Sequence, residues 1–173
     1  VLCSNDKYQY ATSTNLGYKI IRTKRLANIL STSISPQFIT KLAGIQRTYD
    51  IISVHLPNPL ACLALMLIRP KAKIVLHWHS DIIKQKFFSK LLRPLETWLL
   101  KRADVVIGAT ENHIVGSDHY DLMKHKYQII PYAFDADILI KQVNNTLLSE
   151  LKNKYLGKKI IFSIGRLVYY KGY

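Results

Sequence analysis

Two histidines and an aspartate stand close together in HWHSD, residues 77–81, within an otherwise apolar neighbourhood. Side chains alternate along a β-strand, so His77 and His79 are expected on one face, joined by Asp81 if the strand extends that far. Two imidazoles and a carboxylate at this spacing could hold a zinc ion and support hydrolysis. However, the sequence has no HExxH motif, and its other histidines are scattered. The competing interpretation, which we favour, is that His77 is a hydrogen-bonded strand residue and that His79 alone reaches a cleft.

A second polar cluster, GRLVYYKG, spans residues 165–172. It follows a short apolar run at 160–164 that predicts a buried strand. Gly165 permits close approach of the backbone to a ligand, while Arg166 and Lys171 could clamp two phosphates, Arg as a fork and Lys as a point charge. The alternative is a surface turn with two solvated cations.

Short apolar runs alternate with helix-length segments along the chain. The strands and helices that this alternation predicts must position both polar clusters. Strands are predicted at 17–23, 50–55, 73–79, 104–110 and 127–132, and helices at 36–49, 58–69, 82–102 and 147–157. Apolar strands separated by helices predict an α/β protein with a Rossmann-like parallel sheet and helices on both faces. Such sheets bind ligands at the carboxyl ends of their strands. This rule singles out His55 with Asn58, His79 with Asp81, the turn at 110–112, Pro131 with Tyr132, and Gly165 with Arg166.

The composition of the sequence changes after Tyr132, where a mixed and more polar segment interrupts the alternation of predicted strands and helices. We therefore expect residues 1–134 to form one domain and residues 135–173 to begin a second Rossmann-like domain. The chain opens on VLCSND, which is typical of the end of a strand entering a loop. We expect the first domain to be incomplete at its start.

The composition is strongly basic, with 25 Lys and Arg against 11 Asp and Glu and a net charge of +14. Such a surface attracts phosphates of nucleic acids, acidic lipids or nucleotides. No RNP-like, KH or zinc-finger pattern is present, so no nucleic-acid partner is expected. Cys3 and Cys62 are far apart and are expected to be free thiols. The longest apolar stretch, 59–68, is about half of what a bilayer crossing needs, so no membrane span is predicted.

The predicted helix at 82–102 has an apolar face and a cationic face, the latter formed by Lys86, Lys90, Arg93 and Lys101. This stripe is either a solvated helix face or a contact for an anionic membrane surface. Pro94 is expected to kink or split the helix.

Five segments together resemble the retaining glycosyltransferases of family four, which have the two-domain GT-B fold. They are HLPNPLACLAL (55–65), RPKAKIVLHWHSDIIKQK (69–86), RADVVIGATENH (102–113), YQIIPYAFD (127–135) and FSIGRLVYYKG (162–172). They cover most of residues 50–173 in the family's order. Within the family, the chain looks most like bacterial enzymes that build surface polysaccharide or lipopolysaccharide.

The resemblance implies a nucleotide-diphosphate sugar as donor and a polysaccharide or lipid-linked glycan as acceptor. It implies that residues 1–134 hold the acceptor and that the second domain holds the donor. Arg166 and Lys171, with Gly165, match the pair that neutralises the donor diphosphate, so no metal and no other cofactor is expected. His79 matches the catalytic-site histidine that positions the donor sugar, and Asn58 and Asp81 are expected on the acceptor side.

The resemblance further implies a cytoplasmic enzyme, peripheral at the inner face of the cell membrane. The family's glycine-rich first loop would precede Val1, and its Glu-bearing donor motif would follow Tyr173. We therefore expect the 173-residue chain to be a fragment without activity of its own. A zinc hydrolase that uses His77, His79 and Asp81, and a basic binding module without catalysis, remain the alternative functions.

Overall fold

The computed structural model describes residues 1–15, 17–29, 32–80, 86–134, 137 and 144–165, and only the backbone of residues 86–91. The chain divides into two compact units, Val1–Tyr132 and Ala133–Tyr173. This division lies close to the boundary expected near residue 134. What each part binds remains a prediction.

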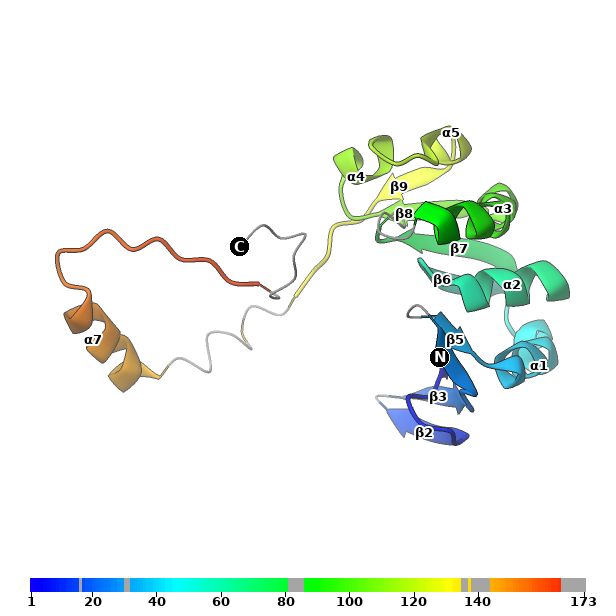
Figure 1. Ribbon diagram of the computed structural model, residues 1–173, viewed down its shortest axis with the longest axis horizontal. Coiled ribbons are helices and arrows are strands. Elements are labelled where there is room, and N and C mark those ends of the chain that lie inside the picture. The colour runs from blue at the N-terminus through cyan, green and yellow to red at the C-terminus, as the bar shows by residue number, and fades with distance from the viewer. Residues whose placement is uncertain (16, 30–31, 81–85, 135–136, 138–143, 166–173) are drawn as a thin grey trace. The chain divides into compact units, whose positions relative to one another are not determined.

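A parallel four-stranded sheet forms the centre of the first unit. Its strands, in spatial order, are β6 (Ile51–Leu56), β7 (Lys73–Trp78), β8 (Val105–Gly108) and β9 (Tyr127–Ile129). In Figure 1 these strands lie side by side, with α2 (Pro59–Ile68) and α3 (Lys86–Arg102) packed across them. The predicted α/β class with a parallel sheet is confirmed, since β6, β7, β8 and β9 all pair in parallel. Parallel neighbours need a long crossover connection, and the helices between these strands supply it.

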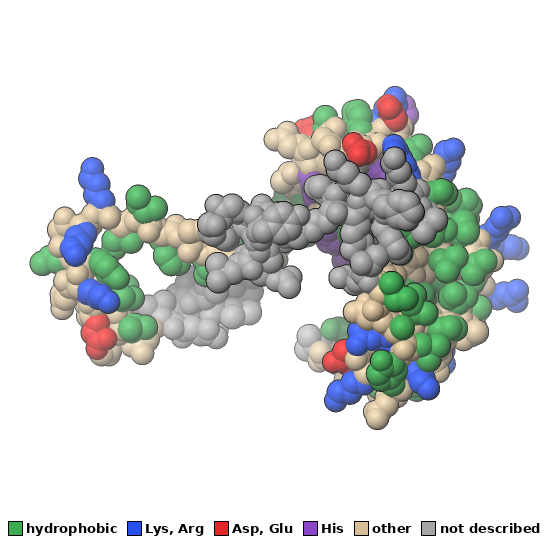
Figure 2. Space-filling model, in the orientation of Figure 1, with side chains coloured by type: hydrophobic (Ala, Val, Ile, Leu, Met, Phe, Trp, Pro, Cys, Tyr) green, Lys and Arg blue, Asp and Glu red, His purple; other side chains and the backbone are tan. Residues whose placement is uncertain are grey.

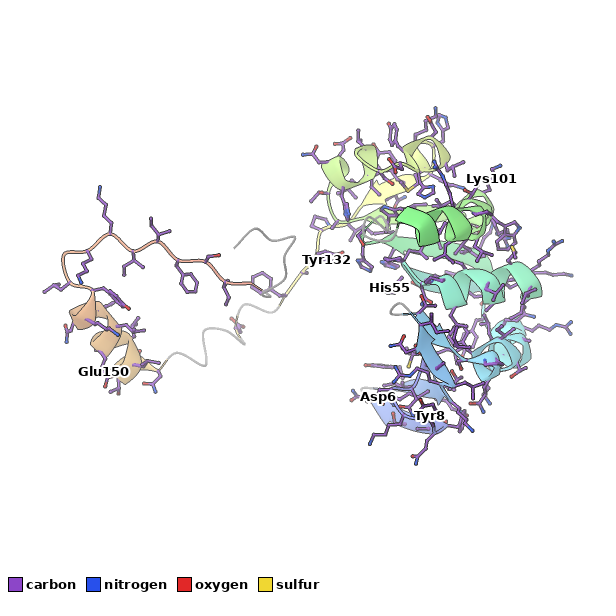
Figure 3. All side chains as sticks on the ribbon, in the orientation of Figure 1. Asp6, Tyr8, His55, Lys101, Tyr132 and Glu150 are labelled. Carbon is purple, nitrogen blue, oxygen red and sulfur yellow. The ribbon has the colours of Figure 1, made fainter. Side chains whose placement is uncertain are left out.

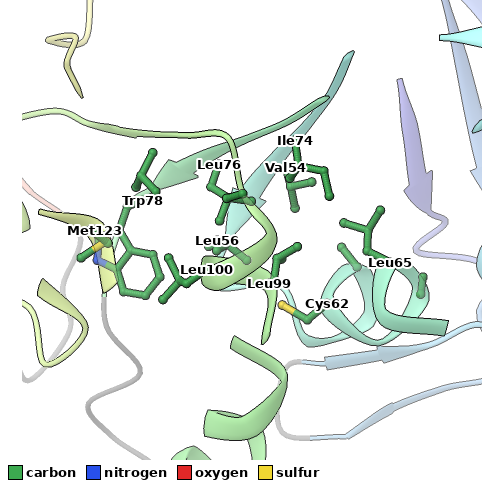
Figure 4. Packing of buried hydrophobic residues seen from close by; sticks show 14 of the residues in the cluster. Val54, Leu56, Cys62, Leu65, Ile74, Leu76, Trp78, Leu99, Leu100 and Met123 are labelled. Carbon is green, nitrogen blue, oxygen red and sulfur yellow. The ribbon is translucent and has the colours of Figure 1, made fainter. Parts of the chain in front are cut away.

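Helices cover one face of this sheet. Alternate residues of β6 and β7, including Val54, Leu56, Ile74 and Leu76, pack into one buried cluster with side chains from the helices (Figure 4). The helices that contribute are α1 (Pro36–Ile45), α2, α3, α4 (Glu111–Val115) and α5 (Tyr120–Met123). On the opposite face of β6, Ile51, Ser53 and His55 are exposed. The second helical layer expected from the sequence is not among the elements described in residues 1–132.

Three smaller strands and a hairpin precede the main sheet. β1 (Leu2–Ser4) pairs in parallel with β3 (Tyr18–Thr23), and β2 (Ala11–Asn15) pairs antiparallel with β3. β4 (Ala27–Ile29) and β5 (Thr32–Ile34) form an antiparallel pair. The sequence predicts β3 and the strand end at Val1–Asp6. It does not reveal β2, β4 and β5, because these strands are short and none of their residues is buried.

Two charged side chains fasten the start of β7 and β8 to the end of α3. Asp104 accepts hydrogen bonds from the Ile74 amide at 2.9 Å, Lys73 Nζ at 2.9 Å and Arg102 Nη1 at 3.2 Å. The amide of Ile74, followed by Lys73, lowers the pKa of Asp104 to about 2. Lys126 donates to the carbonyls of Leu100 and Lys101, in the last turn of α3, and to the carbonyl of Ala103, which follows the helix. These contacts fix the position of the starts of the strands relative to the end of α3.

The helix α3 begins at Lys86 in the described residues and continues through Pro94 to Arg102. Pro94 therefore does not split it. No helix in the part of the chain that the structure describes is long and apolar enough to cross a membrane.

The second unit contains α7 (Asn145–Lys154), close to the helix predicted at 147–157. Asn144 caps it by accepting a hydrogen bond from the Leu147 amide at 3.1 Å. The predicted buried strand at 160–164 is wrong for the described chain, since these residues form no strand and Ile161 and Phe162 are 100% and 78% exposed. A strand needs a neighbour for its backbone groups, and no described strand pairs with this segment.

Candidate active site

Three histidines meet at the carboxyl ends of β6 and β7. The parallel register places His55 beside His77, and their rings stack with centroids 4.4 Å apart and planes 6° apart. His79 follows β7 directly, and its Nε2 forms a hydrogen bond of 2.8 Å with His55 Nδ1. His77 and His79 therefore lie on the same side of the sheet, as strand alternation predicts, with ring centroids 6.4 Å apart.

Tyr132, the last residue of the first unit, completes the cluster. Its ring stacks on His79 with centroids 5.7 Å apart, and its hydroxyl is hydrogen-bonded to His79 Nδ1. Figure 3 shows Tyr132 and His55 at the same end of the unit. Both ring nitrogens of His79 are thus engaged. In a neutral imidazole one nitrogen donates and the other accepts, so the partners of His79 also determine its tautomer.

The surroundings of His77 and His79 favour the neutral state of these two rings. Burial, followed by the charge of His55, lowers the pKa of both His77 and His79 below the ordinary value. A proton on one ring disfavours a proton on the next because the rings are in contact. At neutral pH, His79 can therefore orient a hydroxyl or accept a hydrogen bond, but it does not act as a fixed cation.

Asn58 has a structural contact beside this cluster. Its Oδ1 accepts a hydrogen bond of 3.1 Å from the Ala61 amide and thereby caps α2. Asn58 and His55 both line a cleft of about 580 Å³ that also receives side chains from β1, β3 and α1. A role of Asn58 toward an acceptor stays a prediction.

The remaining predicted site residues are Asp81, Gly165, Arg166 and Lys171. Asp81, Arg166 and Lys171 lie outside the described residues. Gly165 is exposed and belongs to the second unit. The phosphate clamp predicted from GRLVYYKG therefore remains a prediction.

The zinc interpretation gains no support from the described residues, among which no group of three or more His, Cys, Asp or Glu is placed to hold a metal ion. The ring nitrogens of His79 point at His55 and Tyr132 instead.

Sequence reasoning singled out His55 and Tyr132 only as residues at strand ends. Their contacts with His79 span 24 and 53 positions of the chain, and no local pattern reports such a meeting. The rule that the carboxyl ends of parallel strands share one edge of the sheet places both residues at this edge, but it does not show that they contact His79.

Comparison with known proteins agrees with the resemblance seen in the sequence. Residues 1–137 match the profile of Glycosyltransferase Family 4. "O-antigen chain mannosyltransferase C" of Escherichia coli is 28% identical over 155 residues, which is 90% of this chain and 41% of that protein. "D-rhamnosyltransferase WbpZ" of Pseudomonas aeruginosa is 28% identical over 156 residues, 90% of this chain and 40% of that protein.

The chain therefore spans about two fifths of the length of these two relatives. A solved structure, Anabaena HepE in complex with UDP, aligns with a TM-score of 0.49 at 18% identity and covers 68% of this chain and 32% of that one. Because the family profile runs over residues 1–137 of a 173-residue chain, this protein belongs to glycosyltransferase family 4.

Proposed function

We propose that this chain contributes the acceptor-side domain, and the beginning of the donor domain, of a retaining glycosyltransferase. Its donor is a nucleotide-diphosphate sugar and its acceptor is a polysaccharide or lipid-linked glycan. Family membership supports sugar transfer, and two of the relatives are an O-antigen chain mannosyltransferase and a D-rhamnosyltransferase. We place the enzyme in the cytoplasm, peripheral to the inner face of the membrane.

The observation that carries this proposal is the placement of His79. The ring stands at the carboxyl edge of a parallel sheet, where α/β folds bind ligands, and is held by His55 and Tyr132. A pre-positioned neutral imidazole is suited to hydrogen-bond a sugar hydroxyl, which would replace one of these two partners.

The chemistry requires little covalent participation of the protein. The bond between the anomeric carbon and the donor phosphate breaks, and the acceptor oxygen bonds to the same face of that carbon. The acceptor proton passes to the departing phosphate oxygen. Negative charge grows on the diphosphate as the bond breaks, and in this proposal Arg166 and Lys171, beside Gly165, stabilise it without a metal. Asn58 and Asp81 face the acceptor.

The role of His79 is tested by measuring the rate of sugar transfer by the full-length enzyme. We expect His79→Ala to lower kcat by roughly 100-fold or more, the effect of removing one pre-positioned hydrogen-bonding group. The matched control is His125→Ala, since His125 is also a histidine of the first unit but is exposed and makes none of the contacts described for the cluster. Equal kcat in His79→Ala and the control would refute the assignment.

Donor binding tests the second unit independently. We expect Arg166→Gln with Lys171→Gln to weaken binding of nucleoside diphosphates by about tenfold or more, as removal of charge-assisted contacts to phosphate predicts. Isothermal titration measures this without catalysis. Unchanged affinity in the double variant would remove the phosphate clamp from the proposal.

A further inference from the structure

The fold holds one of the two partners of His79, His55, firmly in place. His55 lies in β6 between the buried residues Val54 and Leu56, and its ring stacks on His77 of β7. The backbone amide of His79 donates to the Leu56 carbonyl at 3.2 Å, which continues the pairing of β7 with β6 beyond the end of β7. His55 and His79 are therefore fixed to the same pair of strands.

The other partner, Tyr132, is held less firmly. In the part of the chain that the structure describes, the last backbone hydrogen bond of its segment joins the Ile130 amide to the Gly108 carbonyl at 2.9 Å, two residues earlier. The Tyr132 side chain is 69% exposed, and histidine side chains also reach the surface of the first unit (Figure 2). A side chain beyond the paired strand is displaced at a lower free-energy cost than one anchored between two strands. Tyr132 is therefore the partner that a ligand can replace.

The direction of the two hydrogen bonds decides which nitrogen of His79 carries the proton. A phenol hydroxyl is a good donor, and donation from Tyr132 to Nδ1 of the neutral ring leaves the ring proton on Nε2. The Nε2–H group then donates to His55 Nδ1, 2.8 Å away. In this arrangement each hydrogen bond has one donor and one acceptor, and Nδ1 offers its lone pair to the hydroxyl that lies against it.

We propose that His55 is a positioning residue that holds His79 through Nε2, and that a substrate hydroxyl binds Nδ1 by displacing the hydroxyl of Tyr132. This inference rests on the proposed function, in which His79 binds a sugar hydroxyl, and it identifies the atom that meets the substrate. A sugar hydroxyl and a phenol hydroxyl both donate to Nδ1, so the exchange leaves the tautomer of His79 and its bond to His55 unchanged. The ring needs no reorientation when substrate binds, which is the property of a preorganised site.

Nitrogen NMR of the 173-residue chain tests the pairing in the absence of donor and acceptor. We expect the chemical shifts of the His79 ring to show the proton on Nε2, with a scalar coupling across the hydrogen bond to His55 Nδ1. In Tyr132→Phe, which keeps the aromatic ring but lacks the hydroxyl, this coupling should persist. A proton on Nδ1, or the lack of a coupling to His55, would overturn the inference whatever the enzyme transfers.

Kinetics of the full-length enzyme test the role of His55. We expect His55→Leu to lower kcat by roughly 10- to 100-fold, the effect of a misplaced catalytic group. His55→Asn, whose amide stands where Nδ1 stood, should restore most of this loss. The matched control is His125→Leu, which replaces an exposed histidine outside the cluster and should leave kcat unchanged. Circular dichroism verifies that each variant is folded, and equal kcat in His55→Leu and His125→Leu would overturn the inference.

The same assay tests the displacement of Tyr132. Tyr132→Phe should raise kcat/KM by about fivefold, the equivalent of one neutral hydrogen bond that the substrate no longer has to replace. Tyr127→Phe is the control, because the Tyr127 hydroxyl donates to Glu111 Oε1 at 3.2 Å and not to the cluster. A loss of kcat in Tyr132→Phe would show that Tyr132, and not His55, positions His79.

The variants also separate this inference from the proposed function. If His79→Ala kept its kcat while the coupling between His79 and His55 was present, the proposed function would be wrong. If His79→Ala lost kcat and His55→Leu did not, the proposed function would stand and the positioning role of His55 would be wrong.

Discussion

The histidine cluster makes stability depend on pH at the level of single residues. Burial and neighbouring histidines lower the pKa of His77 and His79 from the ordinary 6.5. Above that value both rings are neutral whether the chain is folded or unfolded. As pH falls below it, the unfolded chain takes up protons first, so stability is lost as pH falls through the folded pKa values.

We therefore expect the free energy of unfolding to be lower at about pH 5.5 than at about pH 7.5. In the double variant His77→Gln, His79→Gln, this decrease should be smaller, because the two titrating rings are gone. Urea unfolding at both pH values measures the difference. Asp104 does not confuse the comparison, because its pKa of about 2 lies well below this range. An identical loss in the unchanged chain and the double variant would contradict the assignment.

The thiol of Cys62 should be chemically inert in the folded chain. Its side chain is buried, and burial, with the charge of Glu96 next, raises its pKa to about 12. In Cys3→Ser, where Cys62 is the remaining cysteine, we expect a thiol reagent at about pH 8 to react only after urea is added. Cys62→Ser, which leaves the partly buried Cys3, is the comparison. Rapid labelling of Cys62 without denaturant would show that the core is open.

At the scale of elements, β8 and α4 approach too closely for any side chain at position 108. A Cβ on Gly108 would stand 2.4 Å from Ile114 Cγ1 and 2.6 Å from Ile114 Cδ1, inside the buried cluster. We expect Gly108→Ala to lower the free energy of unfolding by about 1–3 kcal/mol, the usual cost of overpacking a core. Chemical denaturation measures the change.

A double-variant cycle separates this clash from a general loss of stability. Ile114→Ala leaves a cavity and destabilises by itself, but the methyl group of Gly108→Ala fills part of that space. The combined variant should therefore be more stable than the sum of the two single changes allows. Simple additivity would mean that the two residues do not meet.

At the scale of the whole molecule, the second unit has no core of its own in the described residues. Every described residue from Ala133 to Gly165 is exposed, including the apolar segment 160–164. Hydrophobic burial is the main source of folding energy, so the first unit should carry the stability measured for the chain.

A chain that ends after Tyr132 should then unfold with a free energy within about 0.5 kcal/mol of the 173-residue chain. Urea titration followed by circular dichroism compares the two, and Tyr132 is retained so that its contact with His79 persists. A loss of more than about 1 kcal/mol on truncation would show that the second unit stabilises the first.

The sequence by itself determined the class of the main sheet, the order of its strands and helices, and the shared side of His77 and His79. These follow from periodicities of two and about 3.6 residues, which are local properties of the chain. Asn58 as a helix start follows from the same local rules, because Pro59 stands directly after it.

Only the tertiary structure decided that His55 and Tyr132 contact His79 and that Lys126 donates to carbonyls in the last turn of α3. It also decided that segment 160–164 forms no strand. Each depends on a partner far away in the chain, or on the lack of one among the described residues. An apolar run indicates only that a segment would be stable as a strand if other elements packed on it. Whether a cover exists depends on how distant elements pack, and no local pattern encodes that.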